Sequence, residues 1–191
     1  MRYRRTDIVA RAVGILDEYG LADLSMRRIA SELGFQPSAL YHHFANKQEL
    51  LAAVADEVLE RGARPRRDDL AWDEVIVAAS HELRDAMLAY RDGAELVATV
   101  HAFGLGAHVP FTRIRAAIAG TGLDDELSRA AAMTVLHFVF GHVSDEQTHL
   151  QAGSAGAIDS APGGRPGAAS FDVGLSLIID GIRQRQIQAV G

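Results

Sequence analysis

The chain has 191 residues, of which 48% are hydrophobic and 23% are charged. This length suits one compact domain, or a small domain joined to a larger one, and the apolar fraction is ample for a buried core. No apolar run reaches the ~18 residues of a membrane-spanning helix, so we expect a cytoplasmic protein with no membrane partner. The absence of cysteine excludes disulfides and thiolate metal sites.

The net charge is −6, which by itself argues against nucleic acid as a partner, but the charge is unevenly distributed. Residues 1–48 carry seven Arg or Lys and five Asp or Glu, giving +2, so the remainder carries −8. A basic segment beside an acidic body indicates that one end contacts phosphates. Residues 2–5 form a basic arm, which is either a frayed terminus or a contact to phosphate or the minor groove.

The first predicted helix spans residues 6–20. Thr6 is its candidate N-cap and Gly20 its end, because apolar residues recur between them at helical spacing. We expect this helix to brace the segment that follows.

Residues 25–47 read as two short helices joined by a tight turn. Ser25 is a candidate N-cap, Gly34 a candidate left-handed C-cap, and Pro37 stands where a second helix opens. The first of these helices has one apolar stripe, formed by Met26, Ile29, Ala30 and Leu33.

Two short helices joined in this way are typical of a helix-turn-helix, whose second helix (here about residues 37–43) enters the DNA major groove. The candidates for base contact are Arg27, Pro37, Ser38, Ala39 and His42. The candidates for phosphate contact are Ser25, Tyr41, His43 and Lys47. The alternative is an ordinary helical hairpin with solvated polar residues.

A connecting helix follows at about residues 47–61, with Asn46 as its cap and Glu49 close to a capping box. Residues 61–69 are dense in charge and contain Pro65, which indicates a linker. We therefore place a DNA-binding domain at 1–61 and a second domain at 62–191.

The second domain is predicted to be helical at 73–90, 95–103, 111–119, 124–151 and 171–190, with a loop at 104–110. Residues 152–170 are rich in Gly and Ala with two prolines, which predicts a flexible loop. No strand pattern or internal repeat occurs. The predicted fold is all-α, with a three-helix helix-turn-helix head and a helical body for ligand binding and dimerisation.

Residues 6–59 resemble the DNA-binding domain of the tetracycline-repressor (TetR) family of transcriptional regulators. The matching pieces are IVARA at 8–12, YGL at 19–21, SMRRIA at 25–30, LGF at 33–35, LYHHF at 40–44 and NKQELL at 46–51. The resemblance implies a homodimeric repressor that binds a palindromic double-stranded DNA operator and is released by a small-molecule inducer. It also implies that the helix at 47–61 transmits ligand binding to the head.

The body resembles the tetracycline repressors themselves in two patches, YRDGA at 90–94 and HFVFG at 137–141 with Asp145 and Gln147. This implies that the last two long helices form a four-helix bundle with those of a second copy. The candidate ligand-binding residues are Met87, Tyr90, Val97, His101, Phe103, Phe111, Met133, Thr134, His137, Phe138 and Asp145. Apolar walls with a few polar anchors suit an aromatic or polycyclic ligand. The alternative is that the Met and Phe residues are simply core.

His137 matches a pocket histidine of the tetracycline repressors, and Asp145 corresponds to a pocket carboxylate. The further histidine that holds magnesium-chelated drug is replaced by Val97, and His101 lies one turn later. We therefore expect an inducer other than the tetracycline–magnesium complex, and no required cofactor.

A divalent metal stays an open question. His142, Asp145, Glu146 and His149 recur at helical spacing, which suits either a metal site or a solvated or interface face.

Two other classes of protein compete with this interpretation. A metal-dependent enzyme of the helical body needs a complete ligand set, but H-E-x-x-H, G-x-S-x-G, P-loop and G-x-G-x-x-G motifs are absent from the sequence. We therefore expect no enzyme. A DNA-binding protein that acts without a ligand fits the same head and differs only in showing no ligand-dependent release.

Overall fold

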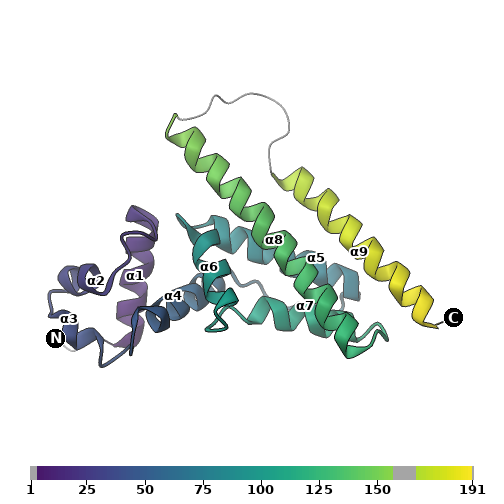
Figure 1. Ribbon diagram of the computed structural model, residues 1–191, viewed down its shortest axis with the longest axis horizontal. Helices are drawn as coiled ribbons and strands as arrows, with labels where there is room; N and C mark the ends of the chain where they lie inside the picture. Colours follow the sequence, from purple (N-terminus) through teal and green to yellow (C-terminus); the bar gives the residue numbers. More distant parts are fainter. Residues whose placement is uncertain (1–3, 157–166, 191) are drawn as a thin grey trace. The chain divides into compact units, whose positions relative to one another are not determined.

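The computed structural model describes residues 4–156 and 167–190, and within them every regular element is a helix, which confirms the all-α prediction (Figure 1). The helices are α1 (Arg5–Tyr19), α2 (Met26–Leu33), α3 (Pro37–Leu40), α4 (Lys47–Gly62), α5 (Trp72–Leu88), α6 (Gly93–Ala102), α7 (Val109–Ala119), α8 (Asp125–Ser154) and α9 (Ala168–Val190). Among the described residues, no helix is both long and apolar enough to cross a membrane.

Contacts within the chain divide it into two compact units. The first comprises the residues up to Ala63 together with Asp85–His108, and the second comprises Arg64–Arg84 together with the residues from Val109 onward. The division falls within α5. Residues 85–108, which contain α6, therefore pack with the helix-turn-helix although they follow the linker in sequence.

In the first unit, α1 packs on α2 and α4, α2 packs on α3, and α4 packs on α6. Its core is made of fully buried apolar side chains from all of these helices and from the turn before α2, among them Ile8, Ile15, Leu16, Leu24, Ile29, Leu40, Leu50, Val54, Leu96 and Val97. The removal of these apolar side chains from water makes the main contribution to the stability of this unit.

The predicted cap of the first helix is wrong by two residues. Arg4, rather than Thr6, is the N-cap, and the Asp7 carboxylate accepts a hydrogen bond from the Arg4 N–H at 2.7 Å. A carboxylate in the first turn favours this start because it also complements the helix dipole. The predicted end at Gly20 is confirmed by its positive φ of 84°.

In the second unit, α8 packs on α7 and α9 around a core that includes Val135, Leu136, Val139, Val143 and Phe171. Asp124 caps α8 by accepting a hydrogen bond from the Leu127 N–H at 2.8 Å, which agrees with the predicted start of this helix at residue 124.

Two predicted loops are shorter in the structure. Val109 and Pro110 belong to α7, since proline is tolerated in a first helical turn. The predicted flexible loop at 152–170 is wrong at both ends, where α8 continues to Ser154 and α9 begins at Ala168. The helices extend into this segment because its alanine and serine residues are compatible with helix. The rest of the predicted loop, residues 157–166, lies outside the described residues.

Candidate functional site

The helix-turn-helix is built as its local chemistry predicts. The Ser25 hydroxyl accepts from the Arg28 N–H at 3.2 Å, which caps α2. Gly34 closes α2 in the left-handed conformation at φ 73°, and the Phe35 N–H reaches back to the Ala30 carbonyl at 3.0 Å. Pro37 then opens α3, which packs against α2. The sharp turn between the two helices is thus set by a few residues with defined capping roles.

The reading helix is shorter than the predicted 37–43. Regular helix ends at Leu40, and Tyr41, His42 and His43 form a turn in which the His43 N–H donates to the Leu40 carbonyl at 2.8 Å. Leu40 and Phe44 are buried, whereas the three residues between them are exposed. The two apolar anchors therefore hold the turn from inside and leave its polar edge toward solvent.

All nine predicted DNA-contacting residues lie on this head, and none is buried. The exposed members are Arg27, Ser38, Tyr41, His42 and His43, and the half-buried members are Ser25, Pro37, Ala39 and Lys47. Of the predicted basic arm, Arg2 and Tyr3 lie outside the described residues.

Lys47 is held at the first turn of α4. The Asn46 side chain accepts from the Glu49 N–H at 2.9 Å, and Glu49 in turn accepts from the Ala45 N–H at 2.9 Å, so the capping box closes one residue earlier than its usual form. Nearby, the Arg5 guanidinium lies 4.6 Å from the centroid of the Phe44 ring. Arg5 thus lies against the end of the reading turn, and Lys47 follows Phe44 three residues later in the sequence.

Two aspartates that the sequence interpretation missed hold the start of α6 and the loop after it within the first unit. Asp92 has φ 55°, and its carboxylate accepts from the Leu21 N–H at 2.8 Å in the turn between α1 and α2. Asp56 on α4 accepts from the N–H of Ala107, φ 56°, at 2.8 Å. Among the described residues, Asp92 and Ala107 are the non-glycine residues with positive φ. Such backbone persists only where its surroundings fix it.

Gly20 is required by the first of these contacts. A Cβ at Gly20 would lie 2.4 Å from the Asp92 carboxylate. The lack of a side chain at Gly20 is therefore what allows the carboxylate to reach the Leu21 N–H.

The predicted ligand-binding residues fall in both units. In the first, Met87 and Val97 are fully buried, Tyr90 and His101 are half-buried, and Phe103 is 62% exposed. The His101 Nδ1 lies 3.3 Å from the Ala107 carbonyl. His101 thus contacts the residue that Asp56 holds.

In the second unit, three predicted ligand residues are half-buried, namely Phe111, Met133 and Phe138. Three are exposed, namely Thr134, His137 and Asp145. The Thr134 hydroxyl donates to the Ala130 carbonyl at 2.9 Å, so its hydrogen is already used within α8.

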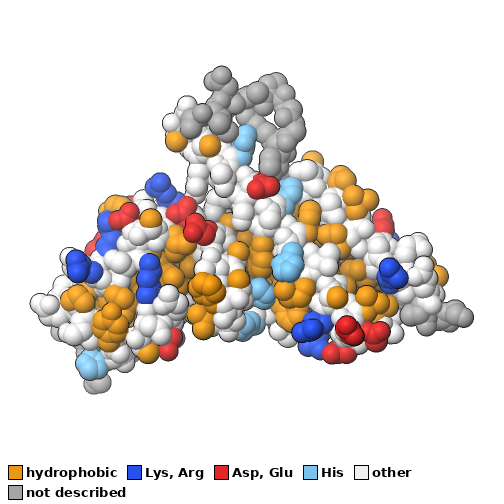
Figure 2. All heavy atoms as spheres, viewed as in Figure 1, with side chains coloured by type: hydrophobic (Ala, Val, Ile, Leu, Met, Phe, Trp, Pro, Cys, Tyr) orange, Lys and Arg blue, Asp and Glu red, His pale blue; other side chains and the backbone are white. Residues whose placement is uncertain are grey.

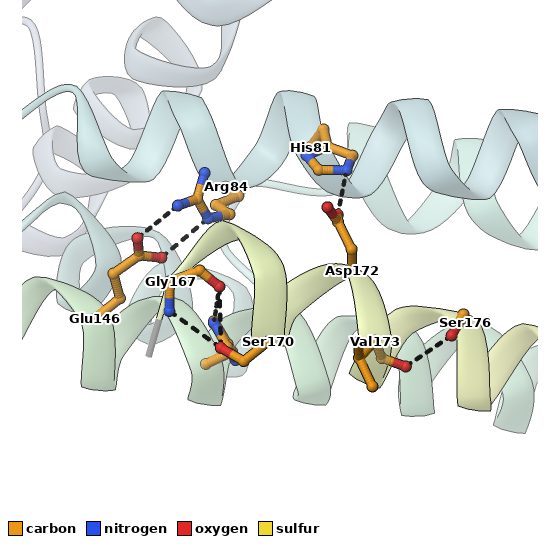
Figure 3. A network of polar contacts seen from close by, with 9 residues as sticks. His81, Arg84, Glu146, Gly167, Ser170, Asp172, Val173 and Ser176 are labelled. Atoms are coloured by element: carbon orange, nitrogen blue, oxygen red, sulfur yellow. Dashed lines mark hydrogen bonds and ion pairs between the residues drawn. The ribbon is translucent and has the colours of Figure 1, made fainter. Parts of the chain in front are cut away.

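Glu146, one of the four residues considered for a metal, faces Arg84 instead (Figure 3). Two hydrogen bonds join the guanidinium and the carboxylate, at 2.9 and 2.5 Å, and the side chains are 13% and 9% exposed. Within residues 4–156 and 167–190, no three His, Asp or Glu side chains group as a metal ion requires.

An aromatic cluster lies beside this ion pair, since the Arg84 guanidinium is 5.6 Å from the centroid of the Phe171 ring. Phe171 is buried, and its ring stacks on Phe138 with centroids 5.5 Å apart. The His81 and His142 rings each contact Phe171 edge-on at 5.3 Å. The His81 Nε2 also lies 2.9 Å from the Asp172 Oδ1 (Figure 3). The sequence carries no local sign of this cluster, because its members are brought together by α5, α8 and α9.

A groove of about 680 Å³ runs along α5 and α9 in the second unit. Val77, Leu175 and Ile179 contribute apolar walls, and Arg183 paired to Asp73 contributes a charged rim. The predicted ligand residues do not line this groove.

Comparison with known proteins gives matches along most of the chain. The family model described as "Bacterial regulatory proteins, tetR family" matches residues 8–54, and the one described as "Tetracyclin repressor-like, C-terminal domain" matches residues 64–165. The tetracycline repressor protein class A from transposon 1721 of Escherichia coli is 33% identical over 199 residues, which span 94% of this chain and 90% of that repressor.

Solved structures agree. The crystal structure of Mycobacterium smegmatis BioQ is 45% identical, covers 95% of this chain and 98% of its own, and has a TM-score of 0.87. A crystal structure of BioQ with its double-stranded DNA operator is 42% identical over the same shares, with a TM-score of 0.78. The chain therefore belongs to the TetR family, and it is a DNA-binding transcriptional regulator of the bacterial type.

Proposed function

We propose that the protein is a homodimeric repressor that binds a two-fold symmetric operator in the bacterial cytoplasm and leaves it when a small molecule binds its helical body. The observation that carries the proposal is the polar edge of the helix-turn-helix. Arg27, Ser38, Tyr41, His42 and His43 are exposed on a frame whose own apolar residues are buried.

The chemistry of that edge suits DNA. A guanidinium at Arg27 matches the two acceptors of guanine in the major groove, and hydroxyl and imidazole groups donate to phosphates or base edges. The small side chains of Ser38 and Ala39 allow the backbone of α3 to approach the groove closely. We assign base contact to Arg27, Pro37, Ser38, Ala39 and His42, and phosphate contact to Ser25, Tyr41, His43 and Lys47.

A second copy of the chain is the partner that suits α8 and α9. Large apolar side chains of α9 are left exposed, at 60% for Val173, 68% for Leu177 and 61% for Ile187. Leu150 on α8 is 56% exposed, and hydrophobic side chains are visible along α8 and α9 in Figure 2. Exposed apolar residues on adjacent long helices favour a helical bundle formed with another chain.

The inducer acts, in this proposal, on α6. Asp92 joins the start of α6 to the turn before α2, and Asp56 joins the loop after α6 to α4. A ligand that favours another conformation of α6 therefore also changes the DNA-binding head. Only such differential affinity for two states can drive release. Met87, Tyr90, Val97, His101 and Phe103 are the ligand residues that we assign to this part of the chain.

In the second unit, the ligand-binding residues that we propose are Phe111, Met133, Thr134, His137, Phe138 and Asp145. Their mixture of apolar walls and polar anchors suits an aromatic or polycyclic molecule. We propose an inducer other than a tetracycline–magnesium complex, because the buried Val97 offers no metal ligand.

The test has two stages. Selection from a random duplex library isolates the DNA that the protein prefers, and the proposal expects a palindromic consensus. A thermal-shift screen of aromatic natural products and antibiotics then finds ligands, since a molecule that binds the folded form raises its melting temperature.

Each hit is then tested for release of the selected duplex. Release that is lost in His137→Ala and kept in His149→Ala, a control on the same helix, supports both the repressor function and the assigned site. If His137→Ala does not affect release, the ligand binds at a site that does not include His137. Tight DNA binding that no hit disturbs identifies a ligand-independent DNA-binding protein instead.

A further inference from the structure

Arg27 and Arg28 are neighbours on α2, but their side chains have different surroundings. Arg27 is exposed. The Arg28 guanidinium lies 3.6 Å from the centroid of the Tyr19 ring, and its Nη1 donates to the Asp23 Oδ1 at 2.8 Å. Its Nε lies 3.4 Å from the Glu32 Oε1. Arg28 therefore faces the protein, while Arg27 faces solvent.

These contacts join three segments of the head. Tyr19 is the last residue of α1, Asp23 lies in the turn after it, and Glu32 is on the last turn of α2. Glu32 also forms an ion pair with Arg11 of α1. The guanidinium thus links α1, the turn and α2 in one charged cluster.

The charge of Arg28 is already balanced where it lies. Two arginines, Arg11 and Arg28, meet two carboxylates, Asp23 and Glu32, so the cluster is neutral. A phosphate contact by Arg28 would require breaking these pairs and the stack on Tyr19. The Tyr19 phenol is uncharged near neutral pH, and a side-chain hydrogen bond with Glu18 raises its pKa further.

We propose that Arg28 is a positioning residue for DNA recognition, which contacts no phosphate and instead fixes the orientation in which α2 presents Arg27 to the operator. The inference rests on the proposed DNA-reading function. Arginine suits this role because its planar guanidinium stacks on an aromatic face and directs a rigid fork of N–H donors toward two carboxylates, whereas the ammonium of lysine is a compact, strongly hydrated charge with no plane to stack.

The experiment measures the affinity for the selected duplex, and for the same duplex with one half-site base pair changed, as a function of salt. Arg28→Lys keeps the charge but loses the planar stack. We expect it to lower the affinity about tenfold, to reduce the preference for the correct base pair, and to leave the salt dependence unchanged.

A phosphate contact gives the opposite pattern. Arg28→Gln would then lower the slope of log affinity against log salt by about 0.9 for each contact, about twice that in a dimer, and Arg28→Lys would retain most of the affinity. That outcome overturns the inference while leaving the repressor function intact. Failure of the wild-type chain to select any duplex overturns the proposed function instead.

Substitutions of the stacking partner give an independent readout. Tyr19→Phe keeps an aromatic face and should bind as the wild type does, whereas Tyr19→Leu should reproduce Arg28→Lys. The double variant Tyr19→Leu/Arg28→Lys should cost no more than Arg28→Lys alone, and fully additive losses contradict the coupling.

Affinities are compared well below each variant's melting temperature, so that loss of folded protein does not contribute. Arg28→Lys and Tyr19→Leu could both keep the wild-type preference for the correct base pair and lower the affinity only by reducing the folded fraction. Arg28 would then have a purely structural role, and the proposal would be contradicted.

Discussion

Two surfaces of the chain, one in each unit, expose different kinds of side chain. In the first unit, the turn after α3 leaves Tyr41, His42 and His43 in solvent, and apolar anchors are buried beneath them. In the second unit, the charged pair Arg84–Glu146 is turned inward, and Leu177 and Ile187 of α9 are left outside. The difference follows from the partner, since a polar edge fits the DNA grooves and an apolar one fits another protein chain.

The largest expected effect tests the inward-facing charges of the second unit. Glu146→Ala leaves the Arg84 guanidinium buried without its carboxylate, and removing one partner of a buried pair costs about 3–5 kcal/mol of unfolding free energy. Urea denaturation measures the loss. The matched control is Asp125→Ala, which breaks the exposed pair with Arg115 and should cost less than about 1 kcal/mol. Equal effects of the two variants would contradict the structural role assigned to the buried pair.

The next prediction tests the apolar outer face. Leu177→Glu places a carboxylate where we expect the second copy to pack, so it should weaken self-association about 100-fold or more, with little effect on the folded chain because Leu177 is 68% exposed. Sedimentation equilibrium measures the dimer. Leu105→Glu makes the same change at a 45% exposed residue outside α9 and should leave association unchanged. Normal association of Leu177→Glu would place the interface elsewhere.

A smaller effect is expected at the polar edge of the head. Arg27→Ala should cost about 1–3 kcal/mol of binding free energy for the selected duplex and relax the preference at one base pair of each half-site, because a bidentate contact to one guanine is lost. Binding titrations with single-base variants of the duplex measure this. If affinity falls equally for every sequence, Arg27 contacts phosphate rather than a base.

The smallest effect is expected at Lys47. Lys47→Ala should weaken all duplexes alike and reduce the salt slope by about 0.9 for each phosphate contact, since an ammonium at the start of α4 contributes charge and no base readout. Titration at several salt concentrations checks the prediction. A change in base preference would show that the reading surface extends to Lys47.

The features that could be predicted from sequence are those with local chemistry. Gly34, Pro37 and Asn46 have capping roles that depend on their own backbone, so the helix-turn-helix and the start of α4 follow from a short stretch of chain. The predicted end of the reading helix, residue 43, is too late, because helical spacing continues to Phe44 although the regular helix stops at Leu40. The extended backbone at Asn46, which α4 needs as its cap, favours an earlier end.

Contacts between residues far apart in the chain could not be predicted from a local sequence pattern. Asp92 and Leu21 are 71 residues apart, and Arg84 and Glu146 are 62 apart, so each pair depends on how helices pack rather than on spacing. Arg28 is similar, because the sequence shows two adjacent arginines and only the packing of α1 on α2 distinguishes them.

The symmetry of the protein–DNA complex tests the central contrast between the two units most directly. Hydroxyl-radical footprinting on the selected duplex should show two equivalent protected half-sites, separated by about one helical turn or more. Both should be lost together in Leu177→Glu. The account holds that the apolar surface of α9 joins two chains and that their two polar surfaces then bind DNA together. A single protected half-site that survives this substitution, or protection without sequence preference, would contradict it.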